Sequence, residues 1–273
     1  MSTDAFVEAE STDNLQIQRS NGVLIITMNR PEAKNALSSS MLVGMADAWA
    51  ELNANDELRC AVLTGAGGNF CTGMDLKATA GGEMDQSYQK RWEEDPDIHW
   101  KALLRHITIE KPIVAAVEGY AVAGGTEMLG ATHLRVAGES ATFGVFEAKR
   151  GLFPLGGSTV RLPRQIGYTN ALEMLLTARG YSAQEAKDIG LIGHIVPDGD
   201  ALDKATELAE MVVANGPLAV KAILQSVRET YDLRYEDALA RELEIGWPIF
   251  GTNDAKEGAK AFSEKRLPNW TST

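Results

Sequence analysis

The chain has 273 residues, enough for one large domain or for a core domain with an appendage. Hydrophobic residues make up 44% and charged residues 23%, so a sizeable core is possible and extensive disorder is excluded. The net charge of −12 argues against a nucleic-acid binder, which usually presents a basic face. A local group of lysines and arginines could still bind a phosphate-bearing ligand.

Residues 1–11 are acidic and contain no apolar run, so we expect a flexible N-terminal tail rather than a signal peptide. The most apolar stretch, residues 112–129, is interrupted by Glu118 and Glu127 and is a poor candidate for a membrane span. We therefore expect a cytoplasmic protein with no membrane partner. The two cysteines, Cys60 and Cys71, have no CxxC spacing and the histidines are scattered, so neither a disulfide framework nor a metal site is predicted.

Short apolar runs alternate with helical patterns through the first two-thirds of the chain. Residues 23–28, 60–64 and 113–117 are typical of buried strands, and residues 134–137 and 194–196 are shorter strand candidates. Between the first two strands, apolar residues at helical spacing predict a helix that is capped by one of the serines 38–40 and runs to about residue 53. This alternation predicts an α/β core over residues 12–198.

The pattern changes near residue 199. Four successive segments, residues 201–215, 217–231, 235–245 and 253–265, favour helices and are separated by glycine and proline. We therefore predict an all-helical C-terminal region over residues 199–273. The stretch over residues 78–96 has weak periodicity, and it indicates either a lid or a plain solvated connection.

Two glycine-containing turns, residues 65–77 and 118–127, each follow a predicted strand. Such turns expose backbone N–H groups to a negative oxygen, and two of them together could form an oxyanion hole. Each turn alone could also be a tight turn that needs positive φ. The first turn has no Gly-Lys-Ser/Thr and carries Phe70 where a dinucleotide fingerprint needs glycine, while residues 156–160 do not form Gly-x-Ser-x-Gly.

Two glutamates lie at the end of the second turn and beyond it. Glu127 lies two residues after Gly125 at the start of a predicted helix, and Glu147 follows the mostly apolar residues 141–146. Burial raises the pKa of a carboxyl group toward the range useful for acid–base catalysis. Both residues could equally be solvated or paired with a cation.

These segments together resemble the crotonase family of enoyl-CoA hydratases and isomerases. The resemblance rests on residues 29–37, 70–76, 119–127 and 143–157, in the family's order and at family-like separations. It implies a spiral of ββα repeats with a C-terminal helical trimerisation region, and a homotrimer or a dimer of trimers. It also implies a lyase of fatty acid metabolism whose coenzyme A is part of the substrate, with no separate cofactor and no metal.

By position, the resemblance assigns the two oxyanion N–H groups to Met74 and Gly124 and the catalytic carboxylates to Glu127 and Glu147. Contacts with the acyl-CoA are implied for six further residues, Lys34, Ala36, Thr72, Asp75, Leu76 and Lys77. Hydration of a 2-enoyl-CoA is the leading hypothesis, because the chain keeps both glutamates. A double-bond isomerase, a dehydratase of a specialised 3-hydroxyacyl-CoA and a non-catalytic acyl-CoA- or RNA-binding relative are the alternatives.

Overall fold

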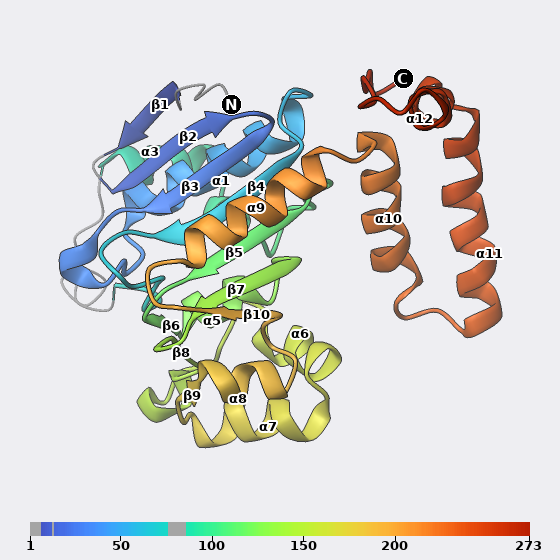
Figure 1. Cartoon of the computed structure of the whole chain (residues 1–273). Helices are drawn as coiled ribbons and strands as arrows, with labels where there is room; N and C mark the ends of the chain where they lie inside the picture. The colour runs from blue at the N-terminus through green and yellow to red at the C-terminus, as the bar shows by residue number, and fades with distance from the viewer. Residues whose placement is uncertain (1–6, 13, 76–85) are drawn as a thin grey trace.

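A computed structural model describes residues 7–12, 14–75 and 86–273 of the chain (Figure 1). Within them, a seven-stranded sheet has the order β1-β2-β3-β4-β5-β7-β10. The first three strands pair antiparallel, and the pairs from β3 to β10 are parallel. The strands are β1 (Val7–Thr12), β2 (Leu15–Ser20), β3 (Val23–Met28), β4 (Cys60–Gly65), β5 (Ile113–Val117), β7 (Leu134–Gly138) and β10 (His194–Val196).

The central strands are buried on both faces, as their continuous apolar runs predict. In β3, Leu24 and Ile26 face the larger core cluster, whereas Val23 and Ile25 face a smaller cluster on the opposite side. Side chains alternate between the two faces of a strand, so each central strand contributes to both cores. The predicted buried strands at residues 23–28, 60–64 and 113–117 are confirmed.

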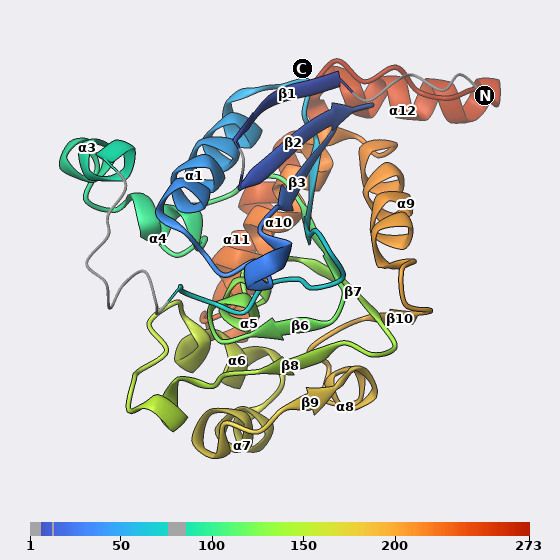
Figure 2. The same ribbon diagram turned by 90° about the vertical axis from the view of Figure 1, so that its left-hand side faces the viewer.

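Helices cover both faces of this sheet (Figure 2). The larger core holds apolar side chains of α1 (Ser39–Ala54), α3 (Gln86–Glu94) and α4 (Ile98–Ala102). The backbone N–H of Met41 donates to the Ser38 hydroxyl at 3.2 Å, which confirms a serine cap for α1. The smaller core is closed by α9 (Ala201–Val213), whose buried residues are alanines at four-residue spacing. Such small side chains allow a helix to lie close to a sheet.

A second, smaller sheet has three strands. Its strands are β6 (Tyr120–Val122), β8 (Thr142–Gly144) and β9 (Tyr181–Ser182), and two isolated bridges, Leu37↔Met74 and Cys71↔Ala121, extend the ladder. The chain passes repeatedly from the large sheet to this small one and then into helices, among them α5 (Gly124–Leu129), α6 (Ser158–Gln165), α7 (Tyr168–Thr177) and α8 (Ala183–Asp188). The predicted α/β spiral of ββα units is confirmed.

Three sequence-based boundaries need correction. The flexible tail predicted over residues 1–11 is wrong for residues 7–11, because backbone pairing of β1 (Val7–Thr12) with β2 makes them part of a strand. The irregular stretch predicted over residues 78–96 contains α3, whereas residues 78–85 lie outside the described part. The boundary at residue 199 precedes α9, which packs on the sheet and belongs to the core.

The remaining C-terminal helices stand beside the core rather than over it (Figure 1). They are α10 (Pro217–Thr230), α11 (Tyr235–Gly246) and α12 (Asn253–Glu264), with the short η3 (Trp247–Gly251) between the last two, as the sequence predicted in outline. The Tyr231 hydroxyl donates to the carbonyl of Arg164 at 2.6 Å, and Lys221 pairs with Glu110 at 2.5 Å. These two contacts tie this helical region to the core.

Candidate active site

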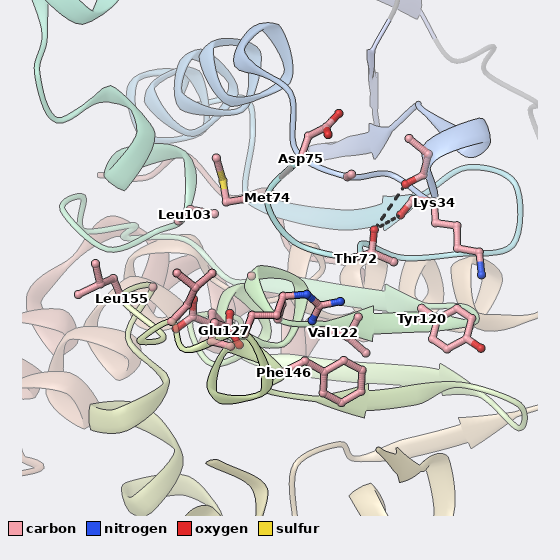
Figure 3. Close-up of a pocket in the computed structure, with 18 of the residues that line it drawn as sticks. Lys34, Thr72, Met74, Asp75, Leu103, Tyr120, Val122, Glu127, Phe146 and Leu155 are labelled. Atoms are coloured by element: carbon pink, nitrogen blue, oxygen red, sulfur yellow. Dashed lines mark hydrogen bonds between the residues drawn. The ribbon is translucent and has the colours of Figure 1, made fainter. Parts of the chain in front are cut away.

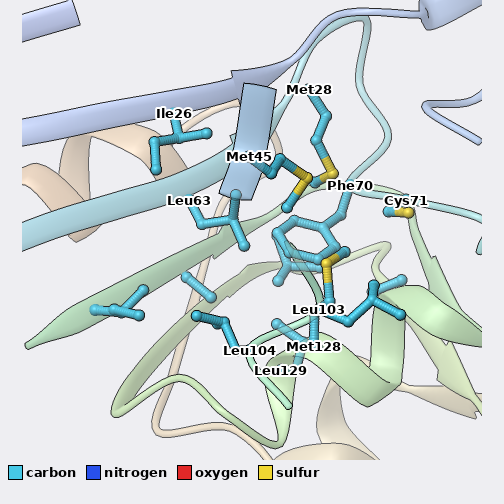
Figure 4. Close-up of a cluster of buried hydrophobic side chains, with 14 of the residues drawn as sticks. Ile26, Met28, Met45, Leu63, Phe70, Cys71, Leu103, Leu104, Met128 and Leu129 are labelled. Carbon is cyan, nitrogen blue, oxygen red and sulfur yellow. The ribbon is translucent and has the colours of Figure 1, made fainter. Parts of the chain in front are cut away.

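A cavity of about 850 Å³ is lined by both predicted glycine turns and both predicted glutamates (Figure 3). This volume lies within the usual range for small-molecule sites, about 300–1,000 Å³. Phe70, Met128, Met28 and Met45 belong to the larger core (Figure 4). Phe70 is followed by the lining residues Thr72 and Met74, and Met128 follows Glu127 by one position, so this packing anchors the segments that carry them.

The first glycine turn presents the N–H of Met74 to the cavity. The Leu37 N–H donates to the carbonyl of Gly73 at 2.8 Å, and the Asp75 N–H donates to the carbonyl of Leu37 at 3.3 Å. Leu37 thus bonds to the residues on either side of Met74, and in such a parallel bridge the residue between them directs its own N–H away from the partner strand. The Met74 amide therefore points away from Leu37, and no hydrogen bond engages it in the part of the chain that the structure describes.

The second turn presents the N–H of Gly124, the first residue of α5, where helical amides have no intrahelical acceptor. The two turns touch, because a Cβ built on Gly73 would lie 2.9 Å from the Gly124 nitrogen. Gly73 also has φ of +87°, a conformation that favours glycine. Among the described residues, no hydrogen bond engages the Gly124 amide either. Two unpaired donors side by side are the arrangement that an oxyanion hole requires.

A buried asparagine that the sequence reading missed holds the first turn. Asn35 donates from Nδ2 to the carbonyls of Ala66 at 2.9 Å and Asn69 at 2.6 Å. Its Oδ1 accepts the backbone N–H of Arg30 at 2.8 Å. The side chain is fully buried, so losing it would leave three polar groups without these partners. Asn35 does not line the cavity, so its role is to position the turn.

Glu127 extends from α5 into the cavity and is only 5% exposed. Its Oε1 accepts the backbone N–H of Ser158 at 3.3 Å. Burial raises the pKa of this carboxyl above its ordinary value, and hydrogen bonds from Ser158 and Gly156, with the Arg161 charge, oppose that rise. A Cβ on Gly156 would lie 2.6 Å from Oε2, so only glycine leaves room for the carboxylate here.

Glu147 begins the short helix η2 (Glu147–Arg150) and reaches the same cavity. Its Oε2 is buried and has no hydrogen-bond partner within the described residues. Burial is the main reason that the pKa of Glu147 rises to about 7, and the nearby negative charge of Glu127 raises it further. The structure thus brings the two predicted carboxylates within electrostatic reach and gives one of them a pKa suited to proton transfer near neutrality.

Four of the six predicted acyl-CoA contacts, Lys34, Ala36, Thr72 and Asp75, line the cavity, whereas Leu76 and Lys77 lie outside the described residues. The Lys34 ammonium lies 4.3 Å from the ring centroid of Tyr120, which adds an aromatic face to this end. Asp75 also pairs with Arg30 at 3.1 Å, a partner that the sequence reading did not find.

The cavity has two chemically different ends (Figure 3). Lys34, Thr72 and Tyr120 lie at one end, Leu103 and Leu155 lie at the other, and Glu127 lies between them. Further lining residues at or near these ends were not predicted, namely Arg30, Glu32, Ala33, His99, Trp100, Leu103, Leu152, Phe153 and Leu155. A polar end, a central pair of carboxylates and an apolar end match an anionic carrier that bears an apolar chain.

The fold and this site define the class of the protein, which is the crotonase superfamily. The chain matches the model of the enoyl-CoA hydratase/isomerase family over residues 18–273. It belongs to this family.

Individual relatives support the same assignment. The chain is 52% identical to the enoyl-CoA hydratase EchA19 of Mycobacterium tuberculosis, with 96% of this chain and 97% of the relative covered. It is 35% identical to a carnitinyl-CoA dehydratase of Salmonella agona, with 95% of this chain and 98% of the relative covered.

Solved structures match over nearly the whole chain. A crystal structure of an enoyl-CoA hydratase from Mycobacterium tuberculosis has a TM-score of 0.84 at 41% identity and covers 96% of this chain and 100% of its own. The structure of an enoyl-CoA hydratase from Bacillus anthracis has a TM-score of 0.86 at 33% identity. The match covers 95% of this chain and 100% of that chain. Within the described residues, no helix is long and apolar enough to cross a membrane.

Proposed function

We propose that this protein catalyses the reversible addition of water to the double bond of a 2-enoyl-CoA thioester. The observation that carries the proposal is the meeting of two buried glutamates, Glu127 and Glu147, with two unpaired amides in one cavity. The names of similar proteins, hydratases above all, support it. Retention of both carboxylates weighs against a non-catalytic binder.

The two amides act on the thioester oxygen. As water adds at C3, negative charge moves through the conjugated system to this oxygen and an enolate forms. The N–H groups of Met74 and Gly124 donate to the developing charge and need no reorganisation, since no protein acceptor competes for them among the described residues. Removal of one such donor typically costs about 10²–10³ in rate.

The two glutamates move the protons. Ionised Glu127 accepts a proton from water as the oxygen bonds to C3, and protonated Glu147 then gives its proton to C2 of the enolate. The pair therefore holds one proton before and after the reaction, although the proton changes its residue. The pKa of Glu147, which burial and the charge of Glu127 raise to about 7, favours Glu147 as the residue that carries the proton in the resting site. Dehydration reverses both transfers.

This assignment predicts a bell-shaped pH dependence for hydration. Activity falls as the pH rises through about 7, because Glu147 then loses the proton that it must donate. Activity also falls on the acid side, through a pKa that burial holds above 4.5, because Glu127 becomes protonated. The pH dependence of kcat/KM, which reports the ionisations of the free enzyme, measures both limbs. A rate without an alkaline limb would contradict the role of Glu147.

Isomerisation of a 3-enoyl-CoA and dehydration of a specialised 3-hydroxyacyl-CoA would use the same two amides. A relative named as a carnitinyl-CoA dehydratase keeps the second alternative open. The alternatives are distinguished by supplying 2-enoyl, 3-enoyl and 3-hydroxyacyl thioesters to one preparation. A hydratase consumes the 2-enoyl substrate and loses the ultraviolet absorbance of the conjugated thioester.

The direct test of hydration uses crotonyl-CoA and a longer 2-enoyl-CoA with the purified protein. We expect the absorbance of the conjugated thioester to decay with at least one of the two. If neither substrate lost its absorbance, in a folded protein that still binds coenzyme A, the proposed function would be contradicted.

We also propose that the protein is a homotrimer or a dimer of trimers. Large apolar side chains remain exposed on the C-terminal helical region, including Ile223, Leu243, Phe250 and Phe262 at 61%, 62%, 77% and 88%. Such a surface is unusual on a monomer and suits contact with further copies. Light scattering coupled to size exclusion should give three or six times the chain mass of 29.5 kDa. A monomeric mass at micromolar concentration would contradict this assembly.

For the substrate, coenzyme A is bound as part of the thioester and no separate cofactor is proposed. Lys34 provides positive charge at the polar end of the cavity, where the phosphates of the carrier would lie, whereas the charge of Arg30 is paired with Asp75. A cytoplasmic location and the absence of nucleic-acid partners remain predictions from the sequence.

A further inference from the structure

Arg161 of α6 is fixed beside the cavity without lining it. Its guanidinium donates from Nη1 to the carbonyl of Gly156 at 3.0 Å and from Nη2 to the carbonyl of Leu104 at 2.6 Å. Gly156 lines the cavity, and so does Leu103, the neighbour of Leu104. The two bonds therefore hold the guanidinium against two segments of the cavity wall, and they leave its charge facing carbonyl oxygens instead of a carboxylate.

Two glycines lie between this guanidinium and Glu127. A Cβ on Gly156 would lie 2.6 Å from the Glu127 Oε2, and a Cβ on Gly157 would lie 3.0 Å from the Arg161 Nη1. The carboxylate and the guanidinium thus approach the same short piece of backbone, which carries no side chain. Glu127 is buried and Arg161 is half-buried, so their charges act on each other through the protein interior, where screening is weaker than in water.

Each of the two groups shifts the ionisation of the other. Burial raises the pKa of Glu127, and the positive charge of Arg161 opposes that rise. Burial lowers the pKa of Arg161, and the charge of Glu127 opposes that fall, whereas Arg105 on its other side adds to it. Glu147, the second carboxyl group coupled to Glu127, carries the proton in the resting site and is then neutral. Arg150 acts on Glu147.

The proposed reaction needs Glu127 in the form that burial disfavours. The residue must be ionised to accept a proton from water, yet a buried carboxyl group prefers to be neutral. A cation bonded directly to the carboxylate would occupy the oxygens that have to meet the water. A cation behind the wall favours ionisation and leaves the cavity side of the carboxylate open, and Arg161 has this position.

We propose that Arg161 is a positioning residue for hydration, whose charge behind the Gly156–Gly157 backbone keeps Glu127 ionised and ready to accept the proton of water. It acts through Glu127 and does not touch the substrate. The inference rests on the proposed function, because it concerns the base of that reaction. It also gives the two successive glycines a shared purpose, since a side chain on either would meet one of the two charged groups.

The test is the pH dependence of kcat/KM for Arg161→Gln, which removes the charge and keeps an amide able to donate to one of the carbonyls. The acid limb should move to higher pH, so that kcat/KM falls below wild type by about tenfold at the acid end and much less near neutrality. The alkaline limb, which Glu147 sets, should stay in place. A purely structural role would lower kcat/KM by the same factor at every pH.

Two further variants are the controls. Arg161→Lys keeps the charge and should keep the wild-type acid limb, even where the rate itself is lower. Arg164→Gln removes a cation of the same helix that donates to the Val160 carbonyl and pairs with Asp232, and it should not move the limb. An unmoved acid limb in Arg161→Gln would overturn the inference. A limb that Arg161→Lys moves would do the same, which keeps the test decisive if Arg161→Gln does not fold.

Infrared titration follows the Glu127 carboxylate without turnover. The protein carries Glu147→Gln, so that Glu127 titrates without its neighbour, and the spectrum of the same protein with Glu127→Gln is subtracted. Addition of Arg161→Gln should make the carboxylate band appear at higher pH. This shift in a protein that hydrates no thioester would support the inference, and the proposed function alone would fail. An unchanged titration would overturn the role of Arg161 whatever the rate of hydration.

Discussion

Replacing either glutamate by glutamine is expected to lower kcat for hydration by at least about 10², the usual contribution of general acid–base catalysis. Glu127→Gln removes the base that accepts the proton of water, and Glu147→Gln removes the acid that protonates C2. Both changes keep the shape of the side chain, so binding of coenzyme A should change little. Glu139→Gln, at an exposed position outside the cavity, should retain the wild-type rate.

The stability of Glu147→Gln separates lost chemistry from lost folding. In the folded protein the pKa of Glu147 is raised from 4.5 to about 7, so the folded state loses stability as the pH rises through this interval. Glutamine removes that cost. The variant should therefore be at least as resistant to thermal unfolding as wild type at about pH 8. An inactive variant that unfolds more easily at this pH would contradict the placement of Glu147 in the site.

Gly73→Ala is expected to disable the oxyanion hole and lower kcat by about 10²–10³. The added Cβ would meet the Gly124 nitrogen and the Ala123 Cβ, each at 2.9 Å, at a position with φ of +87°. The two turns must then move apart, and their amides can no longer meet on one oxygen. Gly246→Ala is the control, since a Cβ there meets nothing within 4 Å. Near-normal hydration by Gly73→Ala would show that the two turns do not act together.

The large parallel sheet could be predicted because its central strands are buried on both faces and therefore appear as unbroken apolar runs. β2 was missed because only Leu15 and Ile17 are buried in it and polar residues fill the rest. The strands of the small sheet have two or three residues each, too few for a period to be visible. α9 could be predicted as a helix, but nothing in its alanine spacing distinguished a helix on the sheet from one in an appendage.

The catalytic groups could be predicted because glycine turns and paired glutamates form short local motifs. The residues that support them could not. Asn35 donates to two carbonyls that lie 31 and 34 positions further along the chain, and Arg30 pairs with Asp75 across 45 positions. No local sequence pattern predicts contacts over such separations. His99 belongs to a helix of five residues, which is too short for a helical period to be visible in the sequence. Its place beside the cavity, where its ring stacks on Trp92, is visible only in the folded chain.

The central claim is that this site adds the elements of water across the double bond of an enoyl thioester. Crotonyl-CoA incubated with the protein in D₂O and followed by nuclear magnetic resonance tests it directly. The predicted product is the 3-hydroxy thioester with one deuterium at C2, formed by wild type and almost absent with Glu127→Gln and Glu147→Gln. Unchanged crotonyl-CoA, or a shifted double bond with no hydroxyl at C3, would contradict the account.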